Sequence, residues 1–149
     1  METKFLKSKI ALGTAQLGLN YGIANRKGKI ALSEMRKILK MAIKNNINTI
    51  ETAESYGNCE KKLGKLKVDK FNILTKLPVK IPKKNIDKWV ENSIKNSIKR
   101  MNIKKLYGIF VHNTKQLNGL NGKIIYTNLL KAKKKLLVKK IGISVYSPK

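Results

Sequence analysis

Cysteine is almost absent from this sequence, and long apolar runs are absent altogether. Because Cys59 is the only cysteine, no disulfide can form within the chain, and a reducing compartment is expected. With no histidine near it in sequence, Cys59 is not predicted to be a nucleophile. No stretch of 18 uninterrupted apolar residues occurs, so no membrane-spanning helix is predicted, and the first residues lack the apolar region of a signal peptide. These absences predict a cytoplasmic protein without a membrane partner.

Acidic residues are also scarce, with 8 of them against 34 lysines and arginines, which gives a formal net charge of +26. Such a charge can bind nucleic acid through the release of counterions. Arginine, whose planar fork clamps phosphates and bases, occurs only at Arg26, Arg36 and Arg100. We therefore interpret the lysines as a compositional bias with solvated faces and do not predict a nucleic-acid partner. A non-catalytic protein whose basic surface binds a polyanion remains an alternative function.

Short apolar runs alternate with amphipathic helical patterns along the whole chain. Strands are predicted at residues 10–13, 48–52, 71–75, 106–111 and 140–145. One helix is predicted to start at an N-cap, Ser33, with the apolar stripe Met35, Ile38, Leu39, Ala42 and Ile43; a short one covers 60–66. A third is capped by Asn85 and buries the stripe Ile86, Trp89, Val90, Ile94, Ile98 and Met101, and a fourth covers 123–137. This repetition predicts one α/β domain with parallel strands and right-handed crossovers.

Four of these strands end in polar groups, namely Glu51, Lys76, His112 and Ser144. Enzymes with a (β/α)8 barrel build their active sites at this end of the strands, which favours a barrel over a doubly wound sheet. Tyr56 follows on the loop after Glu51. Each of these residues has an ordinary structural interpretation on its own, and only their combination predicts a site.

Four of these side chains could form a proton relay, namely Glu51, Tyr56, Lys76 and His112. A carboxylate at Glu51 would pair with Lys76, and an ammonium beside Tyr56 favours the phenolate. His112 could orient a carbonyl oxygen. A phenol in this setting can protonate a developing alkoxide while hydride arrives from a nicotinamide.

The order of the motifs resembles that of the aldo-keto reductases. The residues that carry the resemblance are 12–18 with 21–22, 48–57 with Glu60 and 63–64, 74–76, 111–112 and 141–148. The resemblance implies an NADP(H)-dependent oxidoreductase that reduces small aldehydes or ketones to alcohols and uses no metal. It implies Tyr56 as the general acid, Lys76 as the partner that lowers its pKa, and His112 as the group that orients the substrate.

By the same resemblance, the cofactor would be NADPH, contacted by Gly13, Thr14, Glu51 and Ser144. Val145 stands where many members of the family have asparagine, so one hydrogen bond to the cofactor is expected to be missing. Glu51 stands where the family usually has aspartate. The additional methylene could displace Lys76 by about an ångström, and a misplacement of that size can slow a reaction by roughly 10²-fold.

A (β/α)8 barrel requires about 250 residues, whereas this sequence provides five strands and four helices. We therefore expect residues 1–149 to form one partial barrel domain that lacks strands six to eight. In the resembled family those strands bind most of the cofactor, so the chain alone is expected to be weakly active or inactive. A C-terminal half-barrel chain is an expected partner, and a self-associating half-barrel is an alternative.

Overall fold

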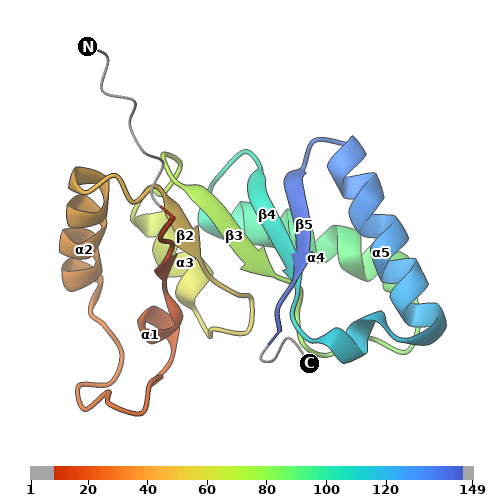
Figure 1. Cartoon of the computed structure of the whole chain (residues 1–149), viewed down its shortest axis with the longest axis horizontal. Helices are drawn as coiled ribbons and strands as arrows, with labels where there is room; N and C mark the ends of the chain where they lie inside the picture. Colours follow the sequence, from red (N-terminus) through yellow and green to blue (C-terminus); the bar gives the residue numbers. More distant parts are fainter. Residues whose placement is uncertain (1–8, 146–149) are drawn as a thin grey trace.

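The computed structural model describes residues 9–145, which form a single five-stranded parallel sheet with helices. The strands are β1 (Leu12–Gly13), β2 (Thr49–Glu51), β3 (Asn72–Lys76), β4 (Leu106–Val111) and β5 (Val138–Ile143). Each strand pairs in parallel with the next in chain order, β1-β2-β3-β4-β5 (Figure 1). A doubly wound sheet would reverse its strand order at a switch point, whereas strands added in sequence are the arrangement of a barrel wall. The predicted α/β class and partial barrel are therefore confirmed.

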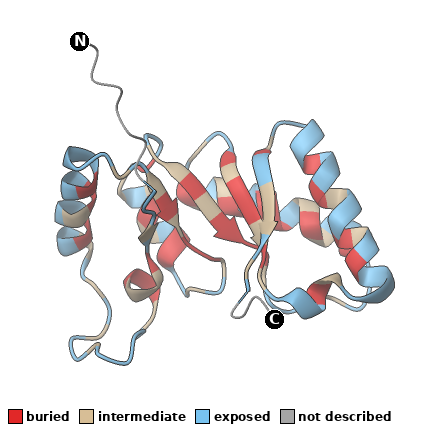
Figure 2. Ribbon diagram, in the orientation of Figure 1, coloured by how far each residue is buried: buried red, intermediate tan, exposed pale blue. Residues whose placement is uncertain are grey.

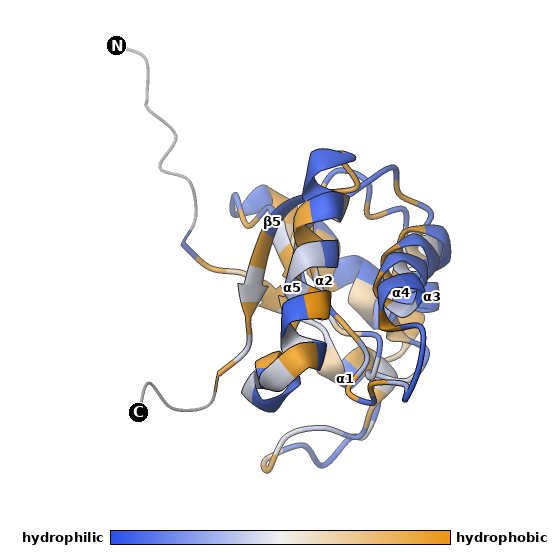
Figure 3. Cartoon of the chain, turned by 90° about the vertical axis from the view of Figure 1, so that its right-hand side faces the viewer, coloured by the Kyte–Doolittle hydropathy of each residue, from blue (hydrophilic) through white to orange (hydrophobic). Residues whose placement is uncertain are grey.

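Helices connect the strands and lie on one side of the sheet (Figures 1 and 3). They are α1 (Ala15–Gly18), α2 (Leu32–Lys44), α3 (Cys59–Lys65), α4 (Ile86–Met101) and α5 (Gly119–Lys134), with a 3-10 helix η1 (Thr114–Leu117). The short helices α1 and η1 were not predicted, because four residues are too few to show a helical period. None of the helices between residues 9 and 145 is long and apolar enough to cross a membrane.

The core fills the space between the sheet and these helices, where buried residues of the strands meet those of α2 to α5 (Figure 2). The strands contribute Ile50, Ile73, Ile109 and Val111, and the helices contribute Leu39, Leu63, Val90, Ile94 and Leu129. The stripe predicted for α4 is buried or packed against this core along its whole length. In α2 the stripe is narrower than predicted, because Ile43 is 53% exposed.

Several predicted boundaries are wrong by a few residues. Helix α2 begins at Leu32 after the N-cap Ala31, so Ser33 lies inside the helix and does not cap it. Asn85 occupies the N-cap of α4 as predicted, but with a left-handed backbone and no side-chain capping bond. Helix α5 begins at Gly119 and ends at Lys134, leaving room for β5 to begin at Val138. The lysine-rich segment 131–140 is thus the end of a helix followed by the start of a strand.

Candidate active site

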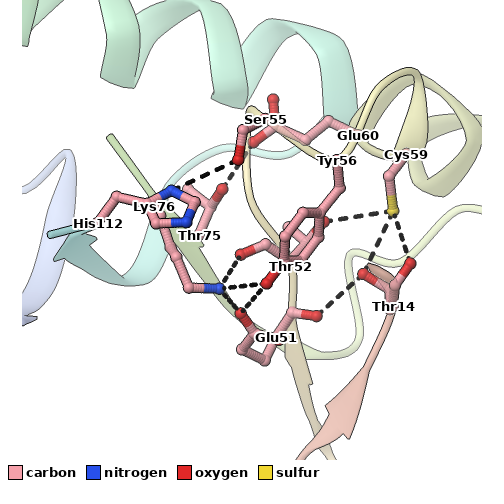
Figure 4. A network of polar contacts seen from close by, with 10 residues as sticks. All are labelled: Thr14, Glu51, Thr52, Ser55, Tyr56, Cys59, Glu60, Thr75, Lys76 and His112. Carbon is pink, nitrogen blue, oxygen red and sulfur yellow. Dashed lines mark hydrogen bonds and ion pairs between the residues drawn. The ribbon is translucent and has the colours of Figure 1, made fainter. Parts of the chain in front are cut away.

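The candidate site lies at the carboxyl ends of β2, β3 and β4, because parallel strands bring these ends to one edge of the sheet. Glu51 is the last residue of β2 and Lys76 the last of β3, while His112 directly follows β4. Tyr56 lies on the loop between β2 and α3. Figure 4 shows the four side chains gathered at this edge.

Lys76 is the centre of the group (Figure 4). Its ammonium forms an ion pair with the carboxylate of Glu51. It also donates hydrogen bonds to the hydroxyl of Tyr56 at 2.9 Å and to the carbonyl of Thr52 at 3.3 Å. The Tyr56 hydroxyl lies 3.5 Å from the same Glu51 oxygen. The additional methylene of Glu51 therefore does not prevent the expected contacts among the three residues.

The electrostatics of Lys76 reflect its position in the protein, where only 7% of the side chain is exposed. Burial lowers its pKa to about 8, because desolvation penalises the ammonium. The Glu51 carboxylate acts in the opposite direction, since a negative charge favours the ammonium. Lys76 is therefore still a cation beside the phenol at neutral pH, and burial brings its titration into the mildly alkaline range.

His112 lies next to Tyr56. Its ring is nearly perpendicular to the Tyr56 ring, at 89°, with 6.5 Å between the ring centres. The Nδ1 atom is 3.4 Å from the hydroxyl oxygen of Ser55. Burial lowers the pKa of His112, the positive charge of Lys76 lowers it further, and a backbone hydrogen bond with Leu77 partly offsets both. These effects favour the neutral imidazole at pH 7, which can donate one hydrogen bond to a carbonyl oxygen.

Two side chains that support this site were missed by the sequence analysis. Ser55 contacts His112, and Gln116 joins the end of β4 to the loop after β3. The side-chain oxygen of Gln116 accepts hydrogen bonds from the backbone of His112 and Asn113, and its nitrogen donates to the carbonyls of Pro78 and Val79. No sequence motif distinguishes Gln116 from other polar loop residues, because its partners are backbone groups.

The residues expected to contact the cofactor differ in accessibility. Gly13 is exposed, and a methyl group added there would meet only Glu51, at 3.8 Å. Glu51 is 26% exposed, and Ser144 is half-buried directly after β5. Gly13, Glu51 and Ser144 are therefore accessible to solvent at the strand ends. The hydroxyl of Thr14, in contrast, is buried: it donates to the carbonyl of Glu51 and accepts from Cys59.

Cys59 is part of this buried support and not of the site itself. Its thiol donates to Thr14 and accepts a hydrogen bond from the hydroxyl of Thr52 at 3.3 Å. Burial raises the pKa of the thiol, against smaller opposing effects of these hydrogen bonds. A buried thiol with a raised pKa is a poor nucleophile, which supports the interpretation that Cys59 has a structural role.

The backbone of Tyr56 packs closely against Gly18. A Cβ atom at Gly18 would overlap the carbonyl oxygen of Tyr56, so the loop can pack on α1 only where residue 18 has no side chain. Gly57 has a φ of +60°, a left-handed conformation that glycine adopts without strain. The two glycines thus place the Tyr56 loop close to α1.

Comparisons with known proteins identify the fold and the family of this chain. A comparison with curated proteins found no match. Among solved structures, a proposed aldo-keto reductase from Pseudomonas aeruginosa is similar over 96% of this chain and 57% of its own, with a TM-score of 0.75 and 24% identity. The holo form of aldo-keto reductase AKR11C1 from Bacillus halodurans is similar over 95% of this chain and 47% of its own, with a TM-score of 0.72 and 17% identity.

These two likenesses show the fold, and this chain spans about half the length of either relative. The model of the aldo/keto reductase family matches residues 9–149, which is nearly the whole chain. The chain therefore belongs to the aldo/keto reductase family.

Proposed function

We propose that this protein performs the proton transfer in an NADP(H)-dependent reduction of a small aldehyde or ketone. One observation carries the proposal: the Lys76 ammonium lies 2.9 Å from the Tyr56 hydroxyl while it is paired with Glu51. Membership of the aldo/keto reductase family supports the same reaction.

Tyr56 would be the general acid. As the carbonyl oxygen of the substrate gains negative charge, the phenol donates its proton to it, and the Lys76 ammonium stabilises the phenolate that remains. The neutral ring of His112 would hold the same carbonyl oxygen by a hydrogen bond. Glu51 would keep the ammonium in place.

The cofactor would lie against the same strand ends. We propose that Gly13, Glu51 and Ser144 contact its nicotinamide end. Thr14 would support Glu51 through its buried hydroxyl, which donates a hydrogen bond to the Glu51 carbonyl. When bound, the nicotinamide would supply the hydride. Val145, which is exposed, would leave one polar contact unmade.

A complete cofactor site would require more than the described residues. The solved relatives are about twice as long as this chain, and we propose that a C-terminal half-barrel supplies the rest of the site. The described chain alone would then bind NADPH weakly and turn over slowly. Self-association of the half-barrel is the alternative way to cover its open side.

Oxidation of NADPH with a panel of small aldehydes tests this proposal, with the chain alone and with a C-terminal half-barrel chain added. Activity is expected to rise on addition and to fall by about 10² or more in Tyr56→Phe, which keeps the ring and removes the acid. Tyr126→Phe is the matched control, because Tyr126 is exposed on α5. Activity that does not depend on Tyr56, or none in either preparation, would contradict the proposal.

A further inference from the structure

We propose that Glu60 is a positioning residue, which fixes β3 against α3 and α4 so that Lys76 meets Tyr56. This inference rests on the proposed function, since it gives the pair of Lys76 and Tyr56 a chemical role. Glu60 acts on this pair through other residues. It lies in the first turn of α3 with only 3% of its side chain exposed.

The carboxylate of Glu60 joins three elements. One oxygen accepts a hydrogen bond of 2.7 Å from the hydroxyl of Thr75 on β3. The other accepts from Ser97 at 3.2 Å and from Arg100 at 2.7 Å, both on α4. Arg100 also forms an ion pair with this oxygen and donates to the Ser97 hydroxyl. Both oxygens of the carboxylate thus have hydrogen-bond partners, and these contacts link α3 to β3 and to α4.

The hydrogen bonds of Glu60 end next to both Lys76 and Tyr56, which form the proposed acid–base pair. Thr75 directly precedes Lys76, and successive side chains of a strand point to opposite faces. Thr75 therefore points toward the helices and Lys76 toward Glu51 and Tyr56 (Figure 4). Tyr56 lies four residues before Glu60, and its carbonyl accepts a hydrogen bond from the backbone of Cys59 at the start of α3. A shift of β3 relative to α3 would change the distance between Lys76 and Tyr56.

A gain in stability alone does not explain the buried ion pair of Glu60 and Arg100. A buried ion pair gains little over apolar residues of the same volume, because both charges must be desolvated. Its directional contacts, in contrast, allow only one alignment of β3, α3 and α4. Because these contacts lie beside Lys76, we infer that their role is to align β3 with α3 and α4.

The test follows Lys76 directly by NMR of the full chain with ¹³C at the ε position of lysine, assigned with Lys76→Met. The pH midpoint of Lys76 is expected near its lowered pKa of about 8. Thr75→Val keeps the shape of the side chain and removes its bond to Glu60, so water can reach Lys76 and the midpoint is expected to rise by about half a pH unit or more. Thr75→Ser keeps the hydroxyl and should restore the original midpoint.

Glu60→Gln gives a second, independent test. Removing a negative charge can only lower the pKa of a nearby lysine, so a rise of the Lys76 midpoint would report displacement and not the lost charge. Glu91→Gln is the matched control, because Glu91 is an acid on α4 whose side chain is 41% exposed and pairs with Lys95 and Lys135. Unfolding in urea, measured in parallel, reports stability separately.

An unchanged Lys76 midpoint in folded Thr75→Val and Glu60→Gln chains would overturn the inference, even where stability falls. The measurement needs neither cofactor nor substrate. Its failure is therefore distinct from absent NADPH oxidation, which would overturn the proposed function.

Discussion

At the scale of single residues, Lys76 and His112 are coupled through charge. The Lys76 ammonium contacts Glu51, Tyr56 and the carbonyl of Thr52, and it is one of the causes that lower the pKa of His112. Because His112 is the only histidine of the chain, its titration can be read without assignment.

Replacing Lys76 by methionine should raise the pKa of His112. The methionine keeps the volume near the ring and removes the positive charge that disfavours the imidazolium. NMR of the single histidine ring as a function of pH gives the midpoint. Lys88→Met, at an exposed site on α4, is the control and should leave it unchanged. A midpoint that stays or falls in Lys76→Met would show that the two residues are not coupled.

The lowered pKa of Lys76 also predicts how stability depends on pH. The folded chain releases the Lys76 proton near pH 8, whereas the unfolded chain holds it until its ordinary value of 10.5. Between these values the unfolded state binds more protons, so this residue makes the folded state more stable as pH rises. Below pH 8 its destabilising effect is fully present.

Urea unfolding of the original chain and of Lys76→Met at pH 8 and pH 10 measures this effect. The titrating groups away from Lys76 are common to both chains, so their contribution cancels in the difference. The original chain should gain stability relative to the variant between the two pH values. An equal change in both chains, or a relative loss, would be inconsistent with a buried ammonium at Lys76.

At the scale of elements, the site depends on how the Tyr56 loop packs on α1. Gly18 and Gly57 allow this approach, because a side chain at Gly18 would overlap the carbonyl of Tyr56. Neither helix α1 nor this contact could be predicted from the sequence, where Gly18 was only part of a family-like motif. The strands, in contrast, were predicted to within two residues at each end, and β4 has the predicted bounds.

Gly18→Ala is expected to lower the free energy of unfolding by about 1–3 kcal/mol, as overpacking does in a close contact. Urea unfolding measures the loss. Gly13→Ala is the control, because its nearest neighbour would lie 3.8 Å away and the change should stay within about 0.5 kcal/mol. A Gly18→Ala chain as stable as the original would mean that the loop does not need this approach.

At the scale of the whole molecule, two properties have opposite effects on the association of chains. Among residues 9–145, β1 and β5 each pair on one side only, and such edges can pair with other strands. The net charge of +26 acts against association of like chains. Which effect dominates should depend on salt, because the screening length falls from about 10 Å at 0.1 M to about 3 Å at 1 M.

We expect the chain to be mostly monomeric at about 0.1 M salt and to associate more at about 1 M, where repulsion is screened. Sedimentation velocity at the two concentrations measures this. Association that weakens with salt would instead indicate that a polyanion bridges the lysines, which is the alternative function considered for the basic surface. A monomer under both conditions would show that the strand edges do not pair.

The sequence by itself determined the parallel α/β fold, the strand ends at Glu51, Lys76 and His112, and the pairing expected between them. It could do so because strand periodicity is local and parallel strands bring their ends to one edge. Only the tertiary structure decided that Thr14 is buried, that Gln116 holds His112, and that Glu60 joins β3 to α4. These contacts link residues 4 to 45 positions apart through side chains whose partners no local pattern specifies.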